Sequence, residues 1–229
     1  GNNNTGTLTN GPTWAGGVQP FSGGRAGGGS LSFDGVNDYV SVSTTNILSL
    51  NDYTYSAWVK VNSNPSAGIG NAIIAIGDVA TADQVLMLTN AYSGFTGFTI
   101  VSYRTGGVAS VSVGSLPTTG IWTHLVMVRN STGNLQLYIN GVLSSAVVAV
   151  GNPTANYGVT PLGKIGSRGS TIQFFNGLID DVRIYNRALS ASEIRYQYNQ
   201  GAPIAWWKMD EQSWSSTTGE VLDSVGTNH

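Results

Sequence analysis

The chain of 229 residues has no cysteine, and only 10% of its residues are charged, against roughly 25% in an average soluble domain. The absence of cysteine excludes a disulfide framework and a zinc site built on thiolates. The ten lysines and arginines are scattered along the chain, so the sequence offers no basic patch for nucleic acid. No apolar run reaches the roughly 18 residues that a membrane-spanning helix needs.

Glycine, at 31 residues, dominates the loops together with Asn, Ser and Thr, while hydrophobic residues make up 41% of the chain. This is enough to bury the core of one large all-β domain or of two small ones. Lysine is nearly absent. The composition favours an extracellular or cell-surface β protein over a cytosolic enzyme.

Apolar residues recur mostly at a period of two, which is typical of β-strands. In one run, Tyr53, Tyr55 and Val59 share a face and Trp58 lies on the other. Short strands separated by Gly, Asn, Asp and Pro at an even spacing indicate a sandwich or a barrel. The spacing predicts strands within residues 30–43, 53–61, 72–78, 84–90, 97–105, 109–115, 124–130 and 135–148.

Two local signals specify turns and ends. Asn140-Gly141 between apolar runs predicts a hairpin with a type I′ turn, because both turn positions need a positive φ. Ser190 precedes Glu193 by three residues, the spacing of a capping box at a helix start. We expect one short helix here, ended by Gly201 and lying over the edge of a sheet.

Five segments in order resemble successive landmarks of the laminin G-like, concanavalin A-like jelly-roll family. The resemblance implies an all-β fold, a sandwich of two curved antiparallel sheets with one short helix. It also implies a role in carbohydrate or protein recognition at cell surfaces. The segments are LSFDGVNDYVSV (31–42), YTYSAWVKV (53–61), GIWTHLVMVRN (120–130), LQLYINGVLSS (135–145) and FFNGLIDDVRIYNRALSASEI (174–194).

The segments at the two ends stand in an unusual order. In this family a strand similar to Ala205–Glu211 usually begins the domain, and a loop similar to residues 1–14 follows it. We therefore expect residues 1–200 to form the jelly roll and residues 201–229 to supply a strand and loop. That strand completes its own sandwich, is donated to a neighbouring copy, or belongs to a longer tandem array.

The expected contact residues on this strand are Ala205, Trp206, Trp207 and Met209. Adjacent side chains on a strand point to opposite faces, so the two tryptophans face opposite ways. One can fill a core, and the other meets solvent, another sheet layer or a neighbouring subunit.

The resemblance also bears on catalysis. Glycoside hydrolases on this sandwich carry Glu-x-Asp-x-x-Glu on one strand, with the two glutamates as nucleophile and acid. This sequence has no such run, since glutamate occurs only at positions 193, 211 and 220. His124 could in principle belong to a Ser-His-Asp triad, but the sequence contains no nucleophile elbow. We expect this histidine to pair across a sheet instead. We expect no enzymatic activity.

Similar sandwiches often hold a structural calcium ion beside the last strand. The residues implied for Ca²⁺ are Asp180, Asp34, the carbonyl of Gly35, and Asp210 from the terminal strand. In the alternative interpretation, Asp34-Gly35 is only a turn, and the acidic pair at 180–181 forms salt bridges with Arg183 or Arg187.

Sugar binding requires exposed aromatic rings near polar groups. The candidates are Tyr92, Phe95, Tyr103, Arg104 and Tyr157, each in or beside a loop rich in Gly or Asn. The sequence therefore favours a non-catalytic recognition or adhesion module for a carbohydrate or a surface protein, within a larger surface assembly. The alternative is a structural subunit of a filament or sheath, assembled with copies of itself by head-to-tail donation of the C-terminal strand.

Overall fold

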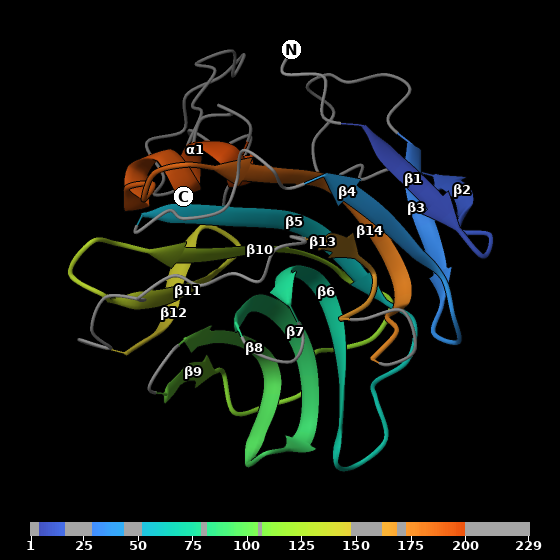
Figure 1. Ribbon diagram of the computed structural model, residues 1–229, viewed down its shortest axis with the longest axis horizontal. Coiled ribbons are helices and arrows are strands. Elements are labelled where there is room, and N and C mark those ends of the chain that lie inside the picture. The colour runs from blue at the N-terminus through green and yellow to red at the C-terminus, as the bar shows by residue number, and fades with distance from the viewer. Residues whose placement is uncertain are drawn as a thin grey trace, which may run out of the picture.

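The computed structural model of the protein describes residues 5–16, 29–43, 52–78, 82–104, 107–147, 162–168 and 173–199. These residues form two antiparallel sheets of seven strands each and one helix, as the sequence predicts (Figure 1). The sheets pack face to face as a jelly-roll sandwich. The only described helix, at nine residues, is far too short to cross a bilayer.

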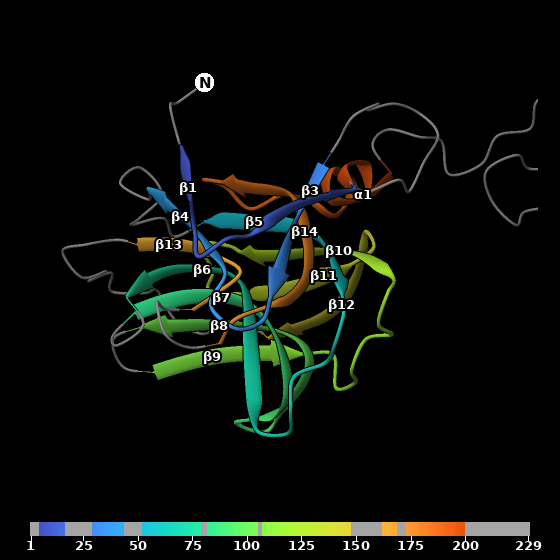
Figure 2. The same cartoon turned by 90° about the vertical axis from the view of Figure 1, so that its right-hand side faces the viewer.

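We name the two sheets A and B. Sheet A contains, in spatial order, β1 (Gly6–Thr9), β4 (Tyr39–Ser43), β13 (Leu162–Ile165), β6 (Ile69–Asp78), β7 (Ala82–Tyr92), β8 (Phe95–Arg104) and β9 (Gly107–Ser112). Sheet B contains β12 (Val142–Val147), β11 (Leu135–Ile139), β10 (Trp122–Arg129), β5 (Tyr53–Val61), β14 (Asn176–Tyr185), β3 (Gly29–Asp34) and β2 (Thr13–Gly16). Figure 2 shows how the strands of sheet A curve past those of sheet B.

The main core lies between the sheets and follows the alternation in the sequence. On β5, Tyr53, Tyr55 and Val59 face this core, whereas Trp58 lies on the other side of sheet B. Sheet A contributes the alternating residues Leu86 and Leu88 of β7. Burial of this continuous apolar layer is the main force that holds the two sheets together.

The N-terminal segment that the sequence interpretation treated as a loop contains two strands. β1 pairs with β4, and β2 pairs with β3. Among the described residues, each lies at the edge of its sheet and has one neighbouring strand. The loop interpretation was wrong because a four-residue edge strand contributes little to the core and needs no apolar alternation.

The predicted turn and capping box are both confirmed. Asn140 and Gly141 adopt φ values of 50° and 78° between β11 and β12. At the start of α1 (Ala191–Asn199), the Glu193 backbone N–H donates to Ser190 Oγ over 3.3 Å, and the Ser190 N–H donates to the Glu193 carboxylate over 2.9 Å. Arg187 also binds this carboxylate through two nitrogens and lowers the pKa of Glu193 to about 2.

Helix α1 covers the outer face of sheet B rather than its edge (Figure 1). Ile194 of the helix is buried against Val126 and Val128 of β10. The Tyr198 ring lies 5.6 Å from the Trp58 ring. The predicted position was wrong because the central strands of sheet B are apolar on both faces, and the outer face requires a cover.

His124 lies beneath the helix and is paired across the sheet with Trp58, as expected. Their rings are 5.1 Å apart, and the imidazole is only 3% exposed. Burial, reinforced by the positive charge of Arg183 and opposed by Asp181, lowers the pKa of His124 from 6.5 to about 4.

Neutral His124 is therefore predicted to make stability depend on pH. Between pH 6.5 and about 4 the unfolded chain binds this proton and the folded chain does not. The free energy of unfolding should be unaffected by this group above pH 6.5 and fall by about 3 kcal/mol on acidification to pH 4. Urea unfolding at a series of pH values measures the effect. The substitution His124→Gln should remove this part of the pH dependence. Parallel plots of unfolding free energy against pH for the unmodified protein and the variant would contradict the prediction.

Candidate functional site

The hairpin between β7 and β8 closes with a two-residue turn. Ser93 and Gly94 have φ values of 50° and 84°, as a type I′ turn requires. Tyr92 and Phe95 pair directly across the hairpin on either side of the turn. Cross-strand partners project from the same face of a sheet, so both aromatic side chains lie on one face.

An extra residue in β7 decides which face this is. Thr89 pairs with Gly97 and Tyr92 with Phe95, so β7 uses three steps where β8 uses two. The additional residue forms a β-bulge at Ala91, which has φ of 50° and whose N–H donates to Thr96 Oγ1 over 3.2 Å. The bulge reverses the alternation and places Tyr92 on the outer face of sheet A.

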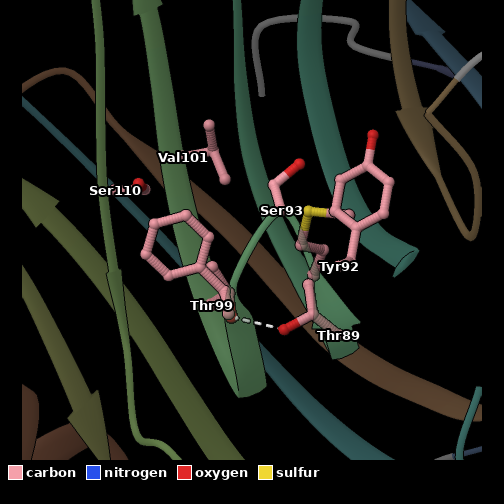
Figure 3. Close-up of a pocket in the computed structure, with 8 residues that line it drawn as sticks. Thr89, Tyr92, Ser93, Thr99, Val101 and Ser110 are labelled. Atoms are coloured by element: carbon pink, nitrogen blue, oxygen red, sulfur yellow. Dashed lines mark hydrogen bonds between the residues drawn. The ribbon is translucent and has the colours of Figure 1, made fainter. Parts of the chain in front are cut away.

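The outer face of sheet A carries a hollow of about 290 Å³ beside this hairpin (Figure 3). Its walls come from three neighbouring strands, β7, β8 and β9, and from the turn. The residues that line it are Met87, Thr89, Tyr92, Ser93, Phe95, Thr99, Val101 and Ser110.

A pair of threonines lies at the base of the hollow. Thr89 Oγ1 and Thr99 Oγ1 are 2.8 Å apart and share a hydrogen bond, drawn in Figure 3, and each also lies 3.2 Å from the Gly97 carbonyl oxygen. Two hydroxyl protons therefore serve two bonds, one within the pair and one to the carbonyl. Both side chains are completely buried, so they join the strands beneath the hollow.

The upper part of the hollow combines aromatic rings with hydroxyls. Tyr92 and Phe95 are half-buried, Ser93 is exposed, and Ser110 is half-buried on the opposite side. Gly70 of β6 lies beside two of the lining residues, because a Cβ at this position would lie 2.5 Å from Met87 Cε and 3.4 Å from the Tyr92 ring. The hollow therefore has an apolar base and an upper part that can accept and donate hydrogen bonds.

The structure brings together two of the sequence-predicted ligand residues, Tyr92 and Phe95. Backbone pairing places Tyr103 and Arg104 at the far end of β8, opposite Val108 and Gly107, and their side chains lie outside the described part of the structure. The remaining sequence candidates on residues that the structure does not describe are Tyr157, Ala205, Trp206, Trp207, Met209 and Asp210.

The sequence interpretation missed the hydroxyl groups of the site. Ser93, Ser110 and the Thr89–Thr99 pair are of residue types that are common throughout this chain, so no composition signal separates them. The alternation along β7 places Thr89 on the same face as Met87, so this residue could have been predicted. The bulge that adds Tyr92 to that face has no clear signal in the sequence.

The expected calcium ligands do not converge in the described part of the structure. Asp34 pairs with Asn176 on β14, four residues before Asp180, which corresponds to roughly 13 Å along the strand. Asp34 Oδ1 accepts hydrogen bonds from the N–H groups of Val36 and Asn37, which is the turn of the alternative interpretation. A single ion held by both Asp34 and Asp180 does not fit this register.

The neighbouring acid, Asp181, binds Arg183 through both carboxylate oxygens at 2.6 and 3.0 Å. Among the described residues, no three His, Asp or Glu side chains form a group that could hold a metal. Calcium at Asp180 together with Asp210 stays a prediction, since Asp210 lies outside the described residues.

Comparison with known proteins places this fold in a family. Residues 33–195 match a laminin G-like model described as the concanavalin A-like lectin/glucanases superfamily. The chain belongs to this superfamily. Both lectins and glucanases share its fold, so membership alone does not separate binding from catalysis.

A curated relative of this superfamily member is an adhesion G-protein coupled receptor V1 of Danio rerio, 28% identical over 81% of this chain and 3% of the receptor. The chain therefore spans only a small fraction of that relative's length.

Similar solved structures include domain 4 of AbnA, an extracellular arabinanase from Geobacillus stearothermophilus, in complex with arabinotriose. It is 22% identical, covers 83% of this chain and 86% of that one, and has a TM-score of 0.62. The binding domain of botulinum neurotoxin DC in complex with SialylT is 14% identical, and the match covers 90% of this chain and 48% of that chain, with a TM-score of 0.64. At these identities the likeness shows the fold alone.

Proposed function

We propose that the protein is a non-catalytic, extracellular recognition or adhesion module that binds carbohydrate in the hollow on sheet A. The observation that carries this proposal is the meeting of two aromatic rings, Tyr92 and Phe95, with the hydroxyls of Ser93 and Ser110 around one concave site.

The chemistry of these groups suits a sugar. A pyranose presents apolar C–H faces that pack on aromatic rings, and hydroxyls at its edges that need hydrogen-bond partners. Tyr92 supplies both a ring and a hydroxyl, and a serine hydroxyl can donate and accept. The turn and the bulge fix Tyr92 on the scaffold, so little conformational entropy is lost on binding.

Three further observations support the proposal. Solved structures with this fold include binding domains in complex with carbohydrates, and the receptor relative is named for adhesion. The sequence lacks the Glu-x-Asp-x-x-Glu run of glycoside hydrolases on this sandwich. The composition, poor in charge and rich in Gly, Asn, Ser and Thr, favours an extracellular or cell-surface protein.

Removal of either ring should weaken sugar binding. We expect Tyr92→Ala and Phe95→Ala each to reduce the affinity for a bound glycan about tenfold or more, since each loses apolar contact. Tyr196→Ala is the matched control, because Tyr196 is exposed on α1 at sheet B. A glycan array followed by calorimetry measures the effect, and equal loss in the control variant would contradict the proposed site.

The alternative function, a filament subunit, is favoured by one observation. β5 pairs with β14 as far as Tyr185, whereas β3 pairs with it only along Asn176–Ile179. Among the described residues, no strand pairs with β14 beyond Ile179 on the β3 side. An open edge of this kind is a template for another strand. Under this second proposal, Ala205–Glu211 of a neighbouring copy occupies the edge.

Light scattering over a concentration series tests the second proposal. Donation in trans predicts that the mass of the full chain grows with concentration, because a head-to-tail contact does not close. A chain that ends at Gly201 should stay small and should bind an added peptide of residues 202–229. A full chain that is monomeric throughout would overturn this second proposal and leave the carbohydrate site unaffected.

A further inference from the structure

The base of the hollow on sheet A is apolar, whereas its upper part carries hydroxyl groups. This difference in polarity determines which sugar the hollow can bind. The inference below rests on the proposed carbohydrate function.

The base of the hollow is apolar. Met87 and Val101 belong to a small apolar cluster on this outer face of sheet A and are 1% and 6% exposed. Thr99 pairs with Met87 across the strands, and the Thr89 and Thr99 hydroxyls bond to each other and to the Gly97 carbonyl; neither side chain is exposed. A ligand group that reaches Met87 and Val101 therefore meets mainly carbon and sulfur, and the two threonines have no free proton to donate to it.

The described lining of the hollow carries no charged side chain. A carboxylate or sulfate on the ligand would lose hydration at this site, and no cation on these residues would compensate it. The hydroxyls of Tyr92, Ser93 and Ser110 match neutral sugar hydroxyls instead.

The size of the hollow limits the ligand further. At about 290 Å³ it lies just below the usual range for ligand pockets, roughly 300–1,000 Å³. It therefore accommodates one sugar residue, with the rest of any glycan outside.

We propose that the hollow selects a single uncharged sugar residue bearing a methyl-terminated group, with the methyl against Met87 and Val101 and the sugar hydroxyls at Tyr92, Ser93 and Ser110. Two kinds of sugar offer this chemistry. One is an N-acetylhexosamine, through its acetamido methyl, and the other is a deoxyhexose, through the methyl that replaces its hydroxymethyl group.

Calorimetry or ligand-observed NMR on the full chain, with paired sugars, tests this selectivity. The first pair is methyl N-acetyl-β-D-glucosaminide against methyl β-D-glucoside, and the second is L-fucose against L-galactose. The third pair, N-acetylneuraminic acid against its primary carboxamide, replaces the charged carboxylate with a neutral group and adds no methyl group. In at least one of the first two pairs, we expect the member with the acetamido or 6-deoxy methyl to bind about tenfold more tightly, and we expect the carboxamide to bind more tightly than the acid. The pair that discriminates identifies the source of the methyl group.

Two variants show whether the preference arises in the hollow. Val101→Thr keeps the shape of the side chain but adds a hydroxyl at the base, and it should reduce the ratio of affinities within the discriminating pair. Gly70→Ala should weaken both members, because its Cβ displaces Met87 Cε. Gly29→Ala on β3 is the matched control, since a Cβ there meets only ordinary contacts at 3.5 Å.

The experiments separate failure of the proposed selectivity from failure of the proposed carbohydrate function. Equal binding within both of the first two pairs, or tighter binding of the acid than of the carboxamide, would overturn the selectivity and leave the carbohydrate function standing. An unchanged ratio in Val101→Thr would overturn the placement of the methyl at the base. Binding of no sugar in the panel, confirmed by a silent glycan array, would overturn the proposed function itself.

Discussion

Ala91 adds one residue to β7 without a counterpart in β8, and the position of Tyr92 depends on this difference. With strict alternation along β7, Leu86 and Leu88 would be followed by Tyr92 on the side of the main core. The bulge turns Tyr92 outward instead, opposite Phe95 and above the Thr89–Thr99 pair. The type I′ turn at Ser93-Gly94 then fixes the register, so one local irregularity creates the aromatic side of the hollow.

The outer faces of the two sheets serve different purposes. Sheet B is covered by α1, which buries Trp58, His124 and Val126 and thereby stabilises the fold. Sheet A has apolar residues on its outer face too, but beside the β7–β8 hairpin it is hollowed and bordered by hydroxyls. The chain thus uses one outer face for packing and leaves part of the other able to contact a ligand.

Much of the fold could be predicted because it depends on signals between near neighbours in the sequence. The alternation in residues 53–61, the Asn140-Gly141 turn and the Ser190–Glu193 capping box each specify their own local geometry. The edge strands β1 and β2 could not be predicted, since their pairing is with distant strands and adds little burial. For the site, Tyr92 and Phe95 were foreseeable as aromatics near a turn. The hydroxyl groups of the site could not be predicted, because pairing across three strands brings them together. That Tyr92 and these hydroxyls share the outer face of sheet A depends on the bulge.

The most direct test of the account is to locate the bound sugar on the protein. Backbone amide shifts of the ¹⁵N-labelled full chain can be followed as a bound neutral saccharide is added. The account predicts that the largest changes occur between Met87 and Val101 and at Ser110, with sheet B unaffected. Changes centred instead on the exposed Trp14 of β2, or on α1, would show that sugar binds elsewhere and would contradict the central claim.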